Sequence, residues 1–244
     1  MDGQSQFRPS DVEPTTVPIV IVGAGPVGLS LGLTLAHQGI ESLILEKNEA
    51  LDPYSRAILI PTRTLDIFDS WNLTAAAKER GIFNSRLQAY GAESGKVAIT
   101  IDFTGLEDAS PNAGFLFLPQ DRTTDLLLNA ALSTGMCKVI FGTAVSGFSQ
   151  DTRGVTVEAV SGGSARRFRC QYVIGCDGAH SLVREMLDLP LAGKTYQARV
   201  LIADVSFSQH DAEDRAQSQG TAGVAPLRRD EVARCRDSRS KRGR

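Results

Sequence analysis

The first strong pattern in the chain is an unbroken apolar run, VPIVIV, at residues 17–22. Branched apolar residues without polar alternation are typical of a strand that is buried on both faces of a parallel sheet. A glycine-rich turn follows, and then a helix with Val27, Leu31 and Leu35 at helical spacing. Residues 42–46 return as a second apolar strand. The pattern predicts a right-handed βαβ unit at the start of an α/β fold.

Later patterns predict a mixture of helices and strands, with a second, antiparallel layer after the βαβ unit. The expected elements are a helix pair over 62–81, strands over 86–90 and 96–103, a helix over 118–135, a hairpin of 138–150 with 154–160, one strand from 165 to Cys176 followed by a tight turn and a helix, and a last strand over 198–208.

The polarity of the two ends sets the expected domain organisation. Residues 1–16 are polar with little periodicity and are predicted to be a loose leader, and the folded body is expected over 17–208. Residues 209–244 end in an arginine-rich stretch and are predicted to be disordered, because they hold too few apolar side chains to offset the entropy of ordering. A solvated terminus is the favoured interpretation, and binding to nucleic acid or anionic lipid is the alternative.

The charge balance and the apolar content narrow the class of protein. The 244 residues carry 26 Lys and Arg against 28 Asp and Glu, a net charge of −2, which argues against a nucleic-acid-binding protein. Residues 227–244 alone carry a net charge of +5, so the remainder is acidic. An apolar content of 42% is ordinary for a globular chain with a real core.

The uncharged stretch 18–36 raises the question of a membrane span or signal peptide. Its four glycines and the acidic residues before it favour a buried strand, turn and helix instead, so no membrane span is expected. The four cysteines lack paired spacing, which argues against a zinc site and a disulfide framework. With no targeting signal in view, a cytoplasmic location is the default expectation.

The turn after the first strand carries the motif GAGPVG, and this context is what a dinucleotide-binding fingerprint requires. Gly23 permits a tight turn, Gly25 has no Cβ to block a pyrophosphate, and Gly28 lets the helix pack closely on the strand. The helix N-terminus presents free N–H groups and a positive dipole to phosphates. The predicted cofactor contacts of this turn are Gly23, Ala24, Gly25, Pro26 and Gly28.

The second predicted strand ends at a carboxylate residue, Glu46, eighteen residues beyond Gly28. Such a carboxylate accepts hydrogen bonds from both hydroxyls of an adenosine ribose and repels a 2′-phosphate. FAD or NAD is therefore favoured over NADP at this site. Glu46 and the adjacent Lys47 complete this part of the predicted cofactor site.

A second motif, CDGAHSLVR at residues 176–184, separates FAD from NAD. It closely resembles the Asp-Gly motif of the FAD-dependent aromatic hydroxylases, the para-hydroxybenzoate hydroxylase family of monooxygenases. The resemblance implies that Asp177 and Gly178 lie near the flavin pyrophosphate, and that Arg184 helps to hold the motif. An Asp on a strand-to-helix turn can also serve as a purely structural helix cap. His180 is expected to be packed or exposed and not a catalytic base.

Two further stretches, SRAILIPTRTLDIF at 55–68 and LPQDRTTDLLL at 118–128, resemble the same family. The resemblance implies that Arg56 reaches the FAD phosphates or ribityl chain, and that Gln120 and Arg122 flank the flavin. An arginine suits such a role because it binds phosphate in a bidentate manner. Surface or helix-capping duties are the alternatives for both arginines.

The resemblance, which runs from about Val17 to Phe207, implies a Rossmann-like FAD-binding domain. Parts of an antiparallel substrate domain, at about 82–118 and 195–208, are expected to interleave with it. Members use NADPH or NADH and O₂ to hydroxylate an aromatic, phenolic or polyketide-like small molecule. The resemblance names no catalytic residue and leaves the oligomeric state open.

Such enzymes also carry a downstream Gly-Asp motif of the type GDAAH, and this sequence has none. The chain is therefore expected to be a shortened member of the family. The alternative function is a catalytically inactive flavin-binding remnant or subunit that needs a partner.

Overall fold

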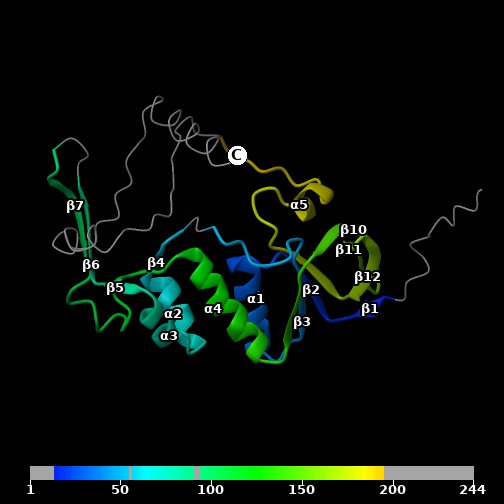
Figure 1. Ribbon diagram of the computed structural model, residues 1–244, viewed down its shortest axis with the longest axis horizontal. Coiled ribbons are helices and arrows are strands. Elements are labelled where there is room, and N and C mark those ends of the chain that lie inside the picture. Colours follow the sequence, from blue (N-terminus) through cyan, green and yellow to red (C-terminus); the bar gives the residue numbers. More distant parts are fainter. Residues whose placement is uncertain (1–13, 55–56, 91–93, 195–244) are drawn as a thin grey trace, which may run out of the picture.

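The computed structural model describes residues 14–54, 57–90 and 94–194. Its centre is a four-stranded parallel sheet in the order β13-β2-β3-β9. Helices α1 and α4 pack against each other on one face of this sheet, and a second sheet covers the opposite face (Figure 1). The central elements are β2 (Ile19–Val22), α1 (Pro26–His37), β3 (Ser42–Leu45), α4 (Gln120–Ser133), β9 (Cys137–Ile140) and β13 (Tyr172–Gly175).

The alternation of side chains along β2 and β3 explains the unbroken apolar runs. Ile21 and Ile44 point into the core beneath α1 and α4. Val20 and Leu43 point to the other face and pack with the second sheet. Because neighbouring residues of a strand face opposite sides, a strand covered on both faces needs apolar residues at every position. The second sheet has the order β1-β12-β11-β10 and contains β1 (Thr15–Thr16), β10 (Thr143–Asp151), β11 (Gly154–Ser161) and β12 (Ser164–Cys170).

Two smaller antiparallel sheets lie beyond α4, at the end of the molecule away from β10–β12 (Figure 1). Helices α2 and α3 pack beside the first of them, whose order is β4-β8-β5. The second is the two-stranded ribbon of β6 and β7. These elements are β4 (Leu59–Pro61), α2 (Thr62–Ser70), α3 (Thr74–Arg80), β5 (Ile82–Asn84), β6 (Arg86–Tyr90), β7 (Val97–Asp102) and β8 (Phe115–Phe117), and the short helix α5 (Leu182–Met186) follows β13.

The predicted fold class is confirmed: a βαβ unit begins a parallel sheet, and antiparallel layers follow it. The helix pair over 62–81, the helix over 118–135 and the antiparallel pairing of 86–90 with 96–103 are confirmed. The predicted hairpin also forms, although only Thr143–Asp151 pairs with Gly154–Ser161, with its turn at Thr152 and Arg153.

Three predictions of element boundaries were wrong. Residues 138–150 form two strands, because the chain turns at Gly142 with a φ of +59° and passes from the parallel sheet to the second sheet. Residues 165–176 also form two strands, β12 and β13, which separate at Gln171. Thr15 and Thr16, predicted to belong to a loose leader, pair in parallel with Phe168 and Arg169.

Several predictions lie outside the described residues. These are residues 1–13 of the leader, Arg56, the strand over 198–208 and the tail 209–244. Within the described ranges, every helix is too short or too polar to cross a membrane.

Candidate functional site

The glycine-rich turn lies between β2 and α1, at the carboxyl end of β2. Gly23 has a φ of +103°, a conformation that favours glycine, and its N–H donates to the carbonyl of Leu45 at 2.8 Å. A Cβ placed on Gly28 would lie 2.0 Å from the carbonyl oxygen of Gly23. Both glycines are therefore required by the protein itself, because the turn folds back onto the first turn of the helix.

Gly25 differs from its two neighbours in the motif. Its φ of −74° and ψ of 179° are open to any residue, and no atom of the described residues lies within 4 Å of a Cβ placed on it. Apart from the mild preference for glycine at a helix N-cap, nothing in the described part of the chain explains the absence of a side chain here. A ligand that approaches the backbone at the N-terminus of α1 does explain it, and a pyrophosphate is the group that this turn fits.

The carboxylate of Glu46 joins the end of β3 to the same turn. One carboxylate oxygen accepts a hydrogen bond from the N–H of Ala24 at 2.8 Å, and the other accepts from the N–H of Asn48 at 3.0 Å. The backbone carbonyl of Glu46 accepts from the N–H of Thr143 at 2.8 Å, which ties this loop to the start of β10. Glu46 is thus fixed beside the glycine-rich turn, as the sequence predicts, while Lys47 next to it is exposed.

The Asp-Gly motif lies directly against the glycine-rich turn, although the two are far apart in the sequence. The N–H of Cys176 donates to the carbonyl of Val22 at 2.8 Å. A Cβ on Gly23 would lie 2.6 Å from the carbonyl oxygen of Cys176, so the two backbones are in close contact. Gly178 has a φ of +83°, which allows the chain to turn towards α5. The carboxyl ends of β2, β3 and β13 therefore bring three predicted motifs to one edge of the sheet.

Asp177 caps the segment that leads into α5. One of its carboxylate oxygens accepts from the hydroxyl of Ser181 at 2.5 Å, and the other accepts from the N–H of Val183 at 3.2 Å. Burial by itself raises the pKa of Asp177, but these hydrogen bonds and one from the N–H of Leu182 outweigh burial, so the pKa lies below its ordinary value. The structure thus gives Asp177 the capping geometry that its position on a strand-to-helix turn suggests.

Sequence reasoning missed Ser181 as part of this site. Its hydroxyl donates to Asp177 and accepts from the N–H of Arg184 at 3.0 Å, as a helix N-cap residue does. The serine directly precedes the apolar start of α5, and that signal could have identified it. Arg184 also donates to the carbonyl of Ala179 at 2.9 Å, so it holds the Asp-Gly turn.

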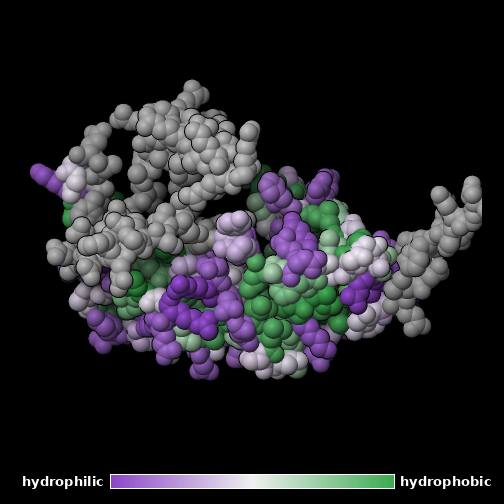
Figure 2. Space-filling view, in the orientation of Figure 1, coloured by the Kyte–Doolittle hydropathy of each residue, from purple (hydrophilic) through white to green (hydrophobic). Residues whose placement is uncertain are grey.

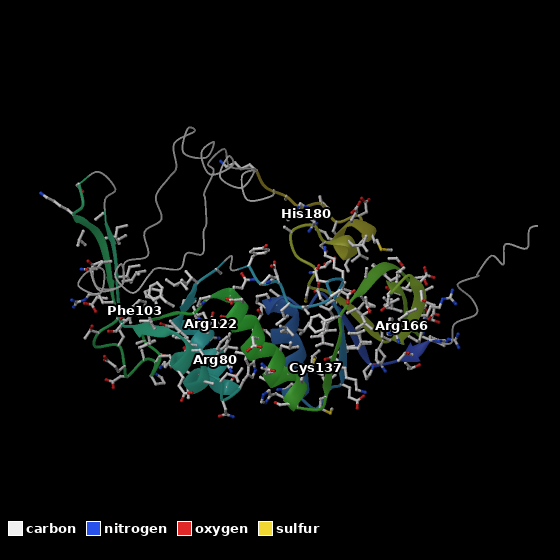
Figure 3. All side chains as sticks on the ribbon, in the orientation of Figure 1. Arg80, Phe103, Arg122, Cys137, Arg166 and His180 are labelled. Atoms are coloured by element: carbon white, nitrogen blue, oxygen red, sulfur yellow. The ribbon has the colours of Figure 1, made fainter. Side chains whose placement is uncertain are left out.

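Cys176 and His180 are the other reactive side-chain types in the motif. Burial raises the pKa of the Cys176 thiol, and the nearby charge of Asp177 raises it further. The thiol therefore stays protonated near neutral pH and is a poor nucleophile. His180 is exposed and points away from the core, above the sheet (Figure 3).

Replacing Asp177 with asparagine is expected to lower the free energy of unfolding by about 1 kcal/mol at pH 7, because a neutral amide accepts through one oxygen only and makes weaker hydrogen bonds than the ionised carboxylate. The low pKa of Asp177 adds stability above the unfolded-state pKa of about 3.9, and this stability is lost as the pH falls through the folded-state pKa. Urea denaturation at pH 7 and pH 3 should therefore show a smaller acid-induced loss for Asp177→Asn than for the unaltered chain.

The exposed carboxylate of Asp188 provides a control for that experiment. Asp188→Asn should not lower the stability at pH 7, because asparagine also tolerates the left-handed conformation of Asp188, whose φ is +52°. Equal acid-induced losses in the unaltered chain and Asp177→Asn would contradict a stabilising role for the ionised Asp177.

Gln120 is the first residue of α4. Because α1 follows β2 and α4 precedes β9 in one parallel sheet, both helices begin at the carboxyl edge, as Figure 1 shows. Gln120 therefore begins its helix at the same edge as the glycine-rich turn. This placement agrees with a contact to the flavin, which stays a prediction.

The structure places Arg122 with α3 instead of with the glycine-rich turn. Its guanidinium donates to the carbonyl of Arg80 at 3.4 Å, and Arg80 in turn pairs with Asp125 at 3.0 Å. These side chains line a shallow surface hollow where α3 meets α4, and Figures 2 and 3 show the hydrophilic residues that gather there. A role for Arg122 beside the flavin stays a prediction, as does that of Arg56.

A strand, a glycine-rich turn and a helix, with a carboxylate at the end of the next strand, define a dinucleotide-binding α/β protein. The Asp-Gly turn packed on the glycine-rich turn agrees with the resemblance of its motif to the FAD-dependent aromatic hydroxylases. The chain belongs to the family of FAD binding domains, which it matches over residues 16–236. Its cofactor is FAD.

Relatives of the chain are flavin-dependent monooxygenases. It is 34% identical to a flavin-dependent monooxygenase of Mycobacteroides abscessus, over 77% of this chain and 40% of the relative. It is 32% identical to the 12-dehydrotetracycline 5-monooxygenase/anhydrotetracycline 6-monooxygenase of Streptomyces rimosus subsp. rimosus, over 78% of this chain and 36% of the relative. The chain thus spans well under half the length of these two relatives.

A solved structure shows the same fold. The p-nitrophenol 4-monooxygenase PnpA of Pseudomonas putida DLL-E4 matches with a TM-score of 0.72 and 24% identity. The match covers 76% of this chain and 47% of that protein. The family match and the monooxygenase relatives, with this shared fold, confirm the predicted resemblance to FAD-dependent aromatic hydroxylases.

Proposed function

We propose that the chain holds FAD for a monooxygenase that uses NADPH or NADH and O₂ to hydroxylate an aromatic small molecule. The observation that carries this proposal is the open space at Gly25, beside the contact between the glycine-rich turn and the Asp-Gly turn. Family membership and the monooxygenase relatives support the reaction.

Different residues at the carboxyl edge bind different parts of FAD. The backbone at Gly25, at the N-terminus of α1, faces the pyrophosphate, because free N–H groups and the helix dipole favour negative charge there. Glu46 accepts hydrogen bonds from the adenosine ribose and repels a 2′-phosphate. Asp177 and Gly178 line the pyrophosphate side of the site. The full proposed set is Gly23, Ala24, Gly25, Pro26, Gly28, Glu46, Lys47, Arg56, Gln120, Arg122, Asp177 and Gly178.

Bound FAD supplies the redox chemistry that transfers one oxygen atom from O₂ to the substrate. The protein holds the groups that bind the cofactor in position. Glu46 is held by two backbone N–H groups, and Asp177 is held by Ser181 and α5, so neither carboxylate has to reorganise when the cofactor binds.

The test is an absorbance spectrum of the purified 244-residue chain after incubation with FAD and desalting. About one retained flavin per chain is the expected result. NADPH oxidation with formation of a hydroxylated phenol then tests catalysis. A colourless chain would contradict the proposal. Retained FAD without any hydroxylation would favour the alternative, a flavin-binding subunit that needs a partner.

A further inference from the structure

Two glycines in the left-handed backbone conformation flank β9, one at each edge of the parallel sheet. Gly135, with a φ of +71°, lies between α4 and β9, and Gly142, with a φ of +59°, lies between β9 and β10. A Cβ on Gly135 would meet no atom of the described residues within 4 Å. A Cβ on Gly142 would lie 2.6 Å and 2.7 Å from the two carboxylate oxygens of Glu49. Of the two glycines, Gly142 is therefore the one in contact with the loop that follows β3.

The turn at Gly142 directs two successive backbone N–H groups at this loop, which carries Glu46. The N–H of Gly142 donates to the carbonyl of Asn48 at 2.8 Å, and the N–H of Thr143 donates to the carbonyl of Glu46 at 2.8 Å. The N–H of Glu46 donates in turn to the carbonyl of Ile140 at 2.9 Å. Three backbone hydrogen bonds thus tie residues 46–48 to residues 140–143, where the chain passes from the parallel sheet to the second sheet.

A series of hydrogen bonds leads from this turn to the side chain of Glu46. Asn48 accepts from Gly142 through its carbonyl, and its N–H donates to one carboxylate oxygen of Glu46 at 3.0 Å. The N–H of Ala24 donates to the other oxygen at 2.8 Å. An ionised carboxylate has about four acceptor sites, so about two remain for the hydroxyls of a ribose. The direction of these two sites depends on the position of Asn48.

The left-handed conformation at Gly142 allows both N–H groups to reach the loop. A β-branched residue is rarely found at such a φ, so valine at this position would turn the backbone out of the left-handed region. Thr143 cannot follow that change freely, because it is buried and pairs with Ser161 of β11. The valine side chain would also displace the carboxylate of Glu49. The hydrogen bond from residue 142 to Asn48 is therefore the one that breaks.

We propose that Gly142 is a positioning residue for recognition of the adenosine ribose. Through Asn48 it sets the direction in which the carboxylate of Glu46 meets the ribose hydroxyls. Hydrogen bonds weaken steeply when they bend, so a carboxylate that has turned away discriminates poorly between a ribose and a deoxyribose. This inference rests on the proposed function, because it takes Glu46 to bind the ribose of FAD.

The test compares ADP with 2′-deoxy-ADP as competitors of FAD on the full chain, followed by flavin fluorescence. The unaltered chain is expected to bind ADP about tenfold more tightly, because 2′-deoxy-ADP lacks a hydroxyl that donates to a charged group. Gly142→Val should reduce this preference to about twofold, because the carboxylate is no longer held in direction. A purely structural role would weaken the binding of both nucleotides equally and leave the preference unchanged.

Gly135→Val is the matched control. It places the same side chain in the same backbone region at the other end of β9, and the N–H of Gly135 also donates to a backbone carbonyl, that of Leu132 at 3.1 Å. Gly135→Val should lower the melting temperature by a comparable amount and keep the tenfold preference. Gly142→Ala is less strained, should reduce the preference to about fivefold, and serves if the valine variant fails to fold.

A double variant tests whether Gly142 acts through Glu46. Glu46→Ala alone should remove the preference for ADP over 2′-deoxy-ADP. Adding Gly142→Val to Glu46→Ala should cause no further change in the preference, because residues that act through one contact are not additive. An additional loss in the double variant would show that Gly142 acts by another route.

Two further results would overturn the proposal. One is an unchanged preference in a folded Gly142 variant, and the other is an equal reduction by Gly135→Val and Gly142→Val. Retention of FAD is measured on the same samples. A chain that retains FAD but gives either result overturns this inference alone, whereas a chain that binds neither FAD nor ADP overturns the proposed function as well.

Discussion

Replacing Gly25 with alanine is expected to weaken FAD binding at least tenfold while the chain stays as stable as before. Among the residues that the structure describes, none has an atom within 4 Å of the added methyl group, and the backbone conformation is open to alanine. Loss of the preferred glycine cap costs some tenths of a kcal/mol, and the reduced entropy of the unfolded chain returns about as much. The methyl group instead occupies the space in which we place the pyrophosphate.

Two measurements check this expectation on the same samples. Thermal unfolding without FAD should give the same midpoint for Gly25→Ala and the unaltered chain. Titration of flavin fluorescence should give the tenfold weaker binding, which corresponds to about 1.4 kcal/mol. Unchanged FAD affinity in a folded Gly25→Ala variant would show that the cofactor lies elsewhere.

The sequence predicts most of the parallel core, because strands that are buried on both faces consist of unbroken apolar runs. Every position of Ile19–Val22 and Ser42–Leu45 is buried, and the apolar runs show it directly. The boundaries of the strands over 138–150 and 165–176 were harder to predict, because each run of strand-forming residues passes without interruption from one sheet to another. Gly142 and Gln171 mark the crossings, and neither residue type is by itself a strong signal of a change of sheet.

The site could be predicted in parts but not as an assembly. The spacing of Gly23, Gly25, Gly28 and Glu46 implies a shared ligand, because a known backbone geometry links them. The carbonyl of Cys176 contacts Gly23 because of the order of strands in the sheet. Local sequence does not encode that order. Contacts made through tertiary structure therefore had to come from the fold.

Gly28→Ala, three residues from Gly25 in the same motif, is expected to destabilise the chain and to abolish FAD binding together. The added Cβ would lie 2.0 Å from the carbonyl oxygen of Gly23 and 3.4 Å from the Cβ of Cys176. The first contact is with backbone, which cannot swing aside as a flexible side chain can. Helix α1 must shift away from the turn, and the shift displaces the N–H groups that face the phosphates.

The expected loss of stability is a balance of two effects. Overpacking against backbone costs about 3 kcal/mol, and the helical preference for alanine over glycine returns about 1 kcal/mol. The net loss of about 2 kcal/mol lowers the melting temperature by roughly 4–8 °C in a chain of this size. Differential scanning calorimetry of Gly28→Ala beside Gly25→Ala measures this difference.

The pair of variants separates a glycine required by the protein from a glycine required by the ligand. Saturating FAD raises the melting temperature of a binding chain, by the equivalent of about 2.7 kcal/mol at one hundred times the dissociation constant. Gly28→Ala should show neither this increase nor the original midpoint. Gly28→Ala could instead melt at the same temperature as the unaltered chain and still gain stability from FAD. That result would show that FAD binding does not depend on the close packing of α1 on the turn.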